Sequence, residues 1–181
     1  WYLQQLLKLG AASSDLIKPA LSRRFLLWDL DMIPLRPLDL FHEDVAGTMR
    51  DVREIGGNVI KSYESSYVDL TGEDMTYAAE GTSYVTHQMV VDADIMNEML
   101  DVFVKKVELT PMAFSMSSSM PRWATAILSS LDRKDLKLGF SEYASYASYV
   151  ATRHPERVYT QPKKTWSVSY THLRAHETLS H

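Results

Sequence analysis

The chain has 181 residues, of which 45% are hydrophobic and 23% are charged, and its formal net charge is −4. These values fit a globular protein of roughly one domain and exclude a disordered or collagen-like chain. The negative charge predicts no nucleic-acid partner, and the lack of cysteine excludes a disulfide scaffold, a thiol nucleophile and a cysteine-ligated zinc site. No stretch approaches the roughly 18 apolar residues of a membrane-spanning helix, so no membrane segment is expected in this chain.

The first elements are a helix and a short strand. Apolar residues form a broad helical face over residues 1–9, and Gly10 is a natural helix end. The continuous apolar run Phe25–Trp28 predicts a buried, parallel strand whose carboxyl end is acidic. Two prolines then predict an extended segment from Ile33 to Phe41.

The middle of the chain has weaker patterns than its second half. Residues 42–83 are polar and predict irregular structure, with one possible strand at Asn58–Lys61. Further on, apolar spacing, capping residues and prolines predict three helices, over residues 95–107, 121–131 and 142–153. The order of a helix, a buried strand, loops and further helices predicts an α/β fold.

The strongest chemical signal is the acidic pair that follows the apolar run. Asp29 and Asp31 are two residues apart, so on an extended chain they lie on the same side at about 6–7 Å. Two such carboxylates repel each other unless a cation lies between them, and a hard divalent ion that bridges to phosphate is the usual solution. The alternative is a pair of solvated turn aspartates.

Four blocks of the sequence together resemble a known family. They are Trp1-Tyr-Leu-Gln-Gln-Leu-Leu-Lys-Leu9, Phe25-Leu-Leu-Trp-Asp-Leu-Asp31 with the segment that follows to Phe41, Thr86-His-Gln-Met89, and Gly139-Phe-Ser-Glu-Tyr-Ala-Ser-Tyr146 followed by His154-Pro155. In order and spacing they resemble a poorly characterised, DxD-containing family of glycosyltransferases with the GT-A fold. The resemblance covers residues 1 to about 166, so we expect residues 1–167 to be part of a GT-A-like, Rossmann-like domain.

The resemblance implies a metal-dependent glycosyltransferase. Such an enzyme moves a sugar from a nucleoside-diphosphate sugar to a hydroxyl of a carbohydrate or glycoconjugate acceptor. Asp29 and Asp31 match the DxD pair, which would bind the donor and Mn²⁺ or Mg²⁺. A metal ion there would neutralise charge on the departing diphosphate.

The resemblance also assigns roles to residues in the later blocks. Glu142 becomes the general base, and His154 a late metal ligand. The substrate-binding candidates are His87, Gln88, Ser141 and Tyr143. Four of these residues also have an ordinary interpretation. His87 could be a half-buried, hydrogen-bonded histidine, Glu142 an acidic residue in a first helical turn, and His154 a helix end. Tyr143 forms an aromatic stripe with Tyr146 and Tyr149, and such a stripe is more often core than a sugar-binding surface.

Two features depart from the family pattern. The DxD pair lies at residue 29, whereas the family places it well into the domain, so the resemblance implies that the nucleotide-binding half precedes this chain. Residues 168–181 have no counterpart in the family and resemble a translated sequencing-adapter tail, so we expect them to lie outside the domain.

Two other functions remain open. A haloacid-dehalogenase-type phosphohydrolase also has an apolar strand that ends in D-x-D, with the first aspartate as nucleophile. That family places a small residue and then Thr or Val after the pair, whereas this chain has Met32-Ile-Pro34. The other alternative is a non-catalytic carbohydrate-binding fragment in which the acidic pair is structural.

Overall fold

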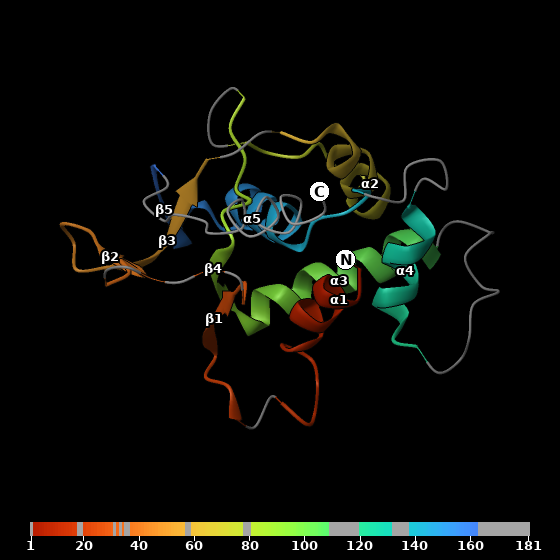
Figure 1. Ribbon diagram of the computed structural model, residues 1–181, viewed down its shortest axis with the longest axis horizontal. Coiled ribbons are helices and arrows are strands. Elements are labelled where there is room, and N and C mark those ends of the chain that lie inside the picture. Colours follow the sequence, from red (N-terminus) through yellow and green to blue (C-terminus); the bar gives the residue numbers. More distant parts are fainter. Residues whose placement is uncertain are drawn as a thin grey trace, which may run out of the picture.

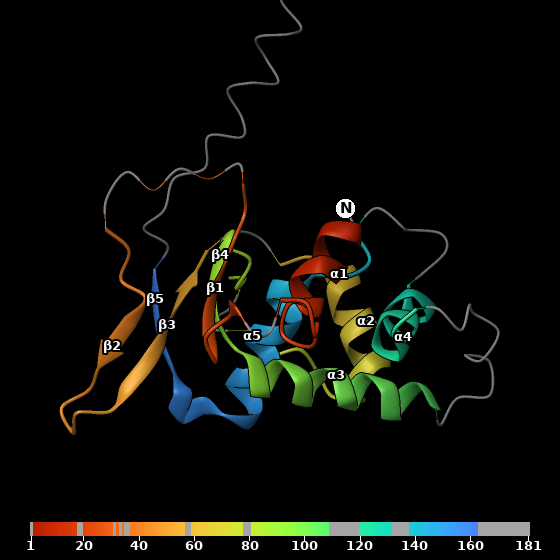
Figure 2. The same cartoon turned by 90° about the horizontal axis from the view of Figure 1, so that it is seen from below.

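The computed structural model describes residues 2–17, 20–30, 32, 34, 37–56, 59–77, 81–108, 120–131 and 138–162. Within them the protein is mixed α/β, as the sequence predicts. The strands gather at one end of the molecule and helices α1–α4 at the other, with α5 between them (Figures 1 and 2). The elements, in chain order, are α1 (Tyr2–Gly10), β1 (Arg24–Trp28), β2 (Phe41–Glu43), β3 (Met49–Ile55), α2 (Lys61–Thr71), β4 (Gln88–Asp92), α3 (Ala93–Glu108), α4 (Arg122–Ser130), α5 (Glu142–Arg153), the 3₁₀ turn η2 (Pro155–Arg157) and β5 (Val158–Pro162).

The strand predicted at Phe25–Trp28 is present as β1, but the prediction that it is parallel is wrong. β1 pairs with β4 in an antiparallel two-stranded sheet, with Trp28 opposite Gln88 and Arg24 opposite Asp92. β4 is buried along its whole length, whereas β1 is only partly buried. An apolar run reports burial, and it carries no information about the direction of the partner strand.

The second sheet has the order β2-β3-β5, and it lies in the segments for which the sequence predicted least. β3 pairs with β2 antiparallel and with β5 parallel. Residues 42–83 therefore contain β2, β3 and α2, so the prediction of irregular structure there is wrong. The possible strand at Asn58–Lys61 is also wrong, because Lys61 begins α2; residue 58 lies outside the described residues.

The hydrophobic pattern of the sequence does not predict β3, because charged residues form part of its buried face. Arg53 is 2% exposed; its Nη1 donates to the carbonyl oxygen of Val90 at 2.8 Å, and its guanidinium lies 5.4 Å from the centre of the Tyr146 ring. Burial lowers the pKa of Arg53, although Tyr146 and Asp51 oppose that change. Arg53 thereby links β3 to β4 and to α5.

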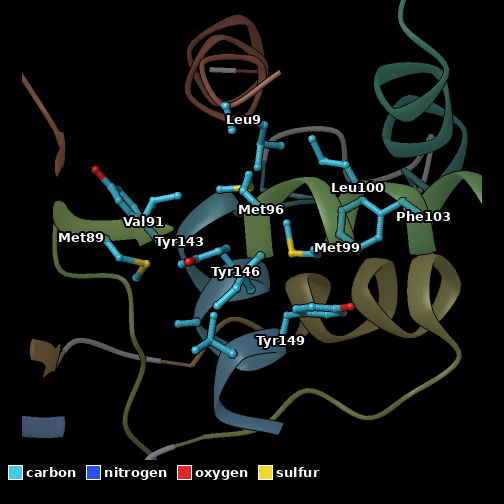
Figure 3. Packing of buried hydrophobic residues seen from close by; sticks show 14 of the residues in the cluster. Leu9, Met89, Val91, Met96, Met99, Leu100, Phe103, Tyr143, Tyr146 and Tyr149 are labelled. Carbon is cyan, nitrogen blue, oxygen red and sulfur yellow. The ribbon is translucent and has the colours of Figure 1, made fainter. Parts of the chain in front are cut away.

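The three helices predicted in the second half are present as α3, α4 and α5. α3 packs against α2, α4 and α5. The core between them contains Met96, Met99 and Phe103 from α3 and the buried tyrosines Tyr146 and Tyr149 from α5 (Figure 3). Tyr146 and Tyr149 are therefore core residues, as the helical spacing of the tyrosines in α5 predicts.

Within the described residues, none of the helices combines the length and the hydropathy that a membrane crossing requires. The tail predicted at residues 168–181 lies outside the described residues.

Candidate functional site

The pairing of β1 with β4 brings two of the predicted site residues together. Asp29 follows β1 directly, and His87 precedes β4 directly. Because Trp28 lies opposite Gln88, the antiparallel ladder continues into these two residues, and the backbone N–H of Asp29 donates to the carbonyl oxygen of His87 at 2.9 Å. Their side chains also meet, with 2.9 Å between His87 Nδ1 and Asp29 Oδ2.

The first turn of α5 brings the next two residues to the same place. Ser141 caps the helix, since its hydroxyl accepts the backbone N–H of Ala144 at 3.2 Å. The cap places Glu142 and Tyr143 at the start of the helix, where both are buried. The hydroxyl of Tyr143 donates to Asp29 Oδ1 at 3.2 Å.

A lysine from α1 completes the cluster. The ammonium of Lys8 forms ion pairs with Asp29 Oδ1 and with Glu142 Oε1, the second at 2.7 Å. The same ammonium lies 4.3 Å from the centre of the Tyr143 ring, within the range of a cation–π interaction. Gln4, one turn earlier on α1, lies with its Nε2 3.4 Å from Asp29 Oδ1.

These contacts move the pKa values of the two carboxyl groups in opposite directions. Burial raises the pKa of Asp29, but hydrogen bonds from His87 and Lys8 outweigh it, so the net pKa lies below the ordinary value. For Glu142, burial prevails over the attraction of Lys8 and raises the pKa. Asp29 is therefore held ionised, whereas Glu142 is the carboxylate that binds a proton more readily.

The low pKa of Asp29 gives a testable dependence of stability on pH. A carboxyl group whose pKa is lower in the folded state stabilises the fold above its unfolded pKa, about 3.9, and loses that contribution as the pH falls through the folded value. We expect Asp29→Asn to be less stable than wild type at pH 7, and the difference to shrink below about pH 4. Urea denaturation over a pH series measures it. The exposed Asp101→Asn is the control, and a gap that stays constant at all pH values would contradict the assignment.

Two other predicted residues stand apart from the hydrogen bonds around Asp29, and a third lies outside the described residues. Gln88 is buried in β4, opposite Trp28. His154 ends α5, so it lies a helix length of about 18 Å from Glu142, and its Nε2 is 3.2 Å from Glu98 Oε2 on α3. Asp31, the second member of the DxD pair, lies outside the described residues.

The described residues alone do not fit the metal that the resemblance implies. Among them, no group of three or more His, Asp or Glu residues is arranged to hold a metal ion. Both oxygens of Asp29 already accept hydrogen bonds or ion pairs, from Lys8 and Tyr143 on Oδ1 and from His87 on Oδ2. The positive charge between Asp29 and Glu142 is the ammonium of Lys8.

Lys8 and Gln4 are the site residues that the sequence analysis did not single out. They are four residues apart, so they lie on one face of α1. A lysine and a glutamine at this spacing within a mostly apolar helix indicate a polar strip on that helix. The sequence of the helix does not show what the strip contacts, because its partners are residues 29 and 142.

No protein-family model matches this chain, and neither the curated proteins nor the solved structures include a significant match to it.

Proposed function

We propose that this chain belongs to a glycosyltransferase that moves a sugar from a nucleoside-diphosphate donor to a hydroxyl group of a carbohydrate or glycoconjugate acceptor. The observation that carries the proposal is that four predicted site residues from separate segments lie together in the structure. Asp29, His87, Glu142 and Tyr143 come from three separate segments, and the resemblance assigns all four to one site. In the structure Asp29 contacts His87 and Tyr143, and Lys8 pairs with Asp29 and Glu142, so the four side chains belong to one cluster. A GT-A-like fold, which belongs to the same proposal, is supported by the acidic residue at the end of β1.

The environment of Glu142 suits the role of general base. Its side chain is 5% exposed, and burial raises its pKa, which makes the ionised form a stronger proton acceptor. An acceptor hydroxyl would give its proton to Glu142 as its oxygen attacks the anomeric carbon of the donor sugar, and the bond from that carbon to the diphosphate would break and release the nucleoside diphosphate. The side chain of His87 is 36% exposed, so it is a candidate for a direct contact with substrate hydroxyls. Ser141 would act indirectly, through its cap on α5.

Calorimetric titration with UDP, GDP, ADP and CDP tests the proposal. We expect at least one of these nucleoside diphosphates to bind the full-length protein, and Asp29→Asn to weaken that binding by about tenfold or more, as the loss of a charge-assisted contact does. The exposed Asp101→Asn should bind like wild type. If the full-length protein binds none of the four, with or without Mn²⁺, the proposal fails.

Two further assays on the same protein distinguish the transferase from the two alternative functions. A phosphohydrolase of the haloacid-dehalogenase type would form an acid-labile phosphoryl group on Asp29 after incubation with a labelled phosphate monoester. A carbohydrate-binding fragment would bind oligosaccharides but would show neither nucleoside-diphosphate binding nor phosphorylation. Either result would replace the proposed transferase.

A further inference from the structure

Two buried carboxylates in the site share one positive charge. The side chains of Asp29 and Glu142 are 12% and 5% exposed, and they come from opposite ends of the described chain. Without a cation between them, two ionised carboxylates so close together and so far from water would be strongly unfavourable. The resemblance assigns the cation beside Asp29 to Mn²⁺ or Mg²⁺, but the structure holds a different one.

The ammonium of Lys8 is built into this position. Its side chain is only 11% exposed, it pairs with both carboxylates, and the face of the Tyr143 ring covers it. A buried ammonium needs such partners as much as the carboxylates need the ammonium, because each unpaired charge would carry a large desolvation cost. The three charges therefore stabilise one another.

The second carboxylate oxygen of Asp29 also has a partner. Oδ2 lies 2.9 Å from Nδ1 of His87, and the backbone N–H of Asp29 is bound to the His87 carbonyl, which holds the two residues in register. A divalent ion would require oxygen ligands at about 2.0–2.6 Å around it. To bind at Asp29 it would have to replace the Lys8 ion pair at Oδ1 or the His87 contact at Oδ2.

We propose that Lys8 is the resident cation of this site. Its ammonium takes the place of the divalent metal beside Asp29, so that Asp29 and Glu142 are held together without a metal ion. Lys8 is a positioning residue in this proposal, because it acts through the two carboxylates. The proposal stands on the geometry of the cluster and does not require the transferase activity, so each can fail without the other.

Thermal unfolding in EDTA, Mg²⁺ and Mn²⁺ tests the proposal. The variants are Lys8→Met, Lys8→Arg, the double variant Lys8→Met with Asp29→Asn, and Lys105→Met, which removes an exposed lysine of α3. We expect wild type and Lys105→Met to melt at the same temperature in EDTA and in excess Mn²⁺. Lys8→Met should melt about 5–10 °C lower than wild type in EDTA, because it leaves two buried carboxylates without their counter-ion.

Metal should then rescue the variant that lacks the ammonium. Excess Mn²⁺ is expected to raise the melting temperature of Lys8→Met and to leave the double variant unchanged, because the latter has lost the carboxylate of Asp29. Lys8→Arg, which keeps the charge, should retain most of the wild-type stability in EDTA. This combination of rescue by Mn²⁺ and retained stability in Lys8→Arg requires a cation at the position of Lys8. If Lys8 only packed against its neighbours, Mn²⁺ would not rescue Lys8→Met.

Other results would overturn the proposal. An Asp29-dependent rise in the melting temperature of wild type with Mn²⁺ would mean that metal binds while Lys8 is present. A Lys8→Met variant that is as stable as Lys105→Met, or that is destabilised but insensitive to Mn²⁺, would mean that Lys8 does not stand in a cation position. If Lys8→Met does not fold, Mn²⁺ binding to wild type and to Asp29→Asn by electron paramagnetic resonance decides the question: equal spectra support the proposal, and binding lost in Asp29→Asn refutes it.

Discussion

Replacing Asp92 by alanine is expected to lower the free energy of unfolding by about 3–5 kcal/mol, the cost of breaking a buried ion pair from one side. Asp92 is fully buried at the junction of β4 and α3. Its Oδ2 pairs with Arg157 Nη2 at 2.9 Å and with Arg23 Nε at 3.3 Å. Its Oδ1 accepts the backbone N–H of Asp94 at 3.0 Å, in the manner of a helix cap. Alanine would leave a partly buried arginine without its carboxylate and the first turn of α3 without its acceptor.

Urea denaturation followed by far-UV circular dichroism measures this loss. Asp94→Ala is the matched control, because Asp94 is two residues away and pairs with Arg23 at 3.0 Å, but its side chain is 70% exposed. An exposed ion pair contributes about 0–1 kcal/mol, so the control should stay within that range. Equal losses in the two variants would show that the ion pairs of Asp92 are not what joins β4 to the turn before β5.

Replacing Glu142 by glutamine is expected to lower the rate of sugar transfer by about 10²–10⁴-fold, the usual contribution of a general base. Glutamine keeps the shape and an oxygen acceptor for Lys8, but it cannot take a proton from an acceptor hydroxyl. Since Glu142 acts on the acceptor in this mechanism, the affinity for the nucleoside diphosphate should change little. The rate is measured as nucleoside diphosphate released in the presence of acceptor, and the affinity by calorimetry.

Glu156→Gln serves as the control for this experiment. Glu156 is exposed in η2, at the other end of α5, so its replacement should leave both the rate and the affinity unchanged. A Glu142→Gln enzyme with the wild-type rate would remove Glu142 from the mechanism. A variant that loses nucleoside-diphosphate affinity together with activity would instead indicate that Glu142 shapes the donor site through Lys8.

The local sequence was enough to predict most helices and the first strand. α3 follows from apolar spacing after an aspartate, and α4 and α5 follow from apolar spacing after a proline and a serine. Ser141 forms the cap that its position before Glu142 predicts. These signals are local, since a helix satisfies its own backbone hydrogen bonds and needs only one apolar face. The run Phe25–Trp28 likewise predicted β1, but not the direction of its partner.

The strands that carry charge could not be predicted in this way. β3 buries Asp51 and Arg53, which pattern analysis takes for surface residues. Arg53 becomes acceptable in the interior only because Val90 supplies a carbonyl oxygen and Tyr146 an aromatic ring. Those partners lie in other elements of the fold, so the residues near Arg53 in the sequence do not predict them.

The candidate site likewise has features that the local sequence predicts and features that depend on the tertiary structure. The sequence by itself determined that Asp29 follows an apolar strand, that Glu142 opens a capped helix and that the chain is mixed α/β, because each depends on residues a few positions apart. Only the tertiary structure decided that Asp29 meets His87 through the β1–β4 register, and that both carboxylates meet Lys8. The reason is physical: a buried charge is tolerated where its counter-charge is placed, and that placement belongs to the packing of α1 against α5 and to the pairing of two strands.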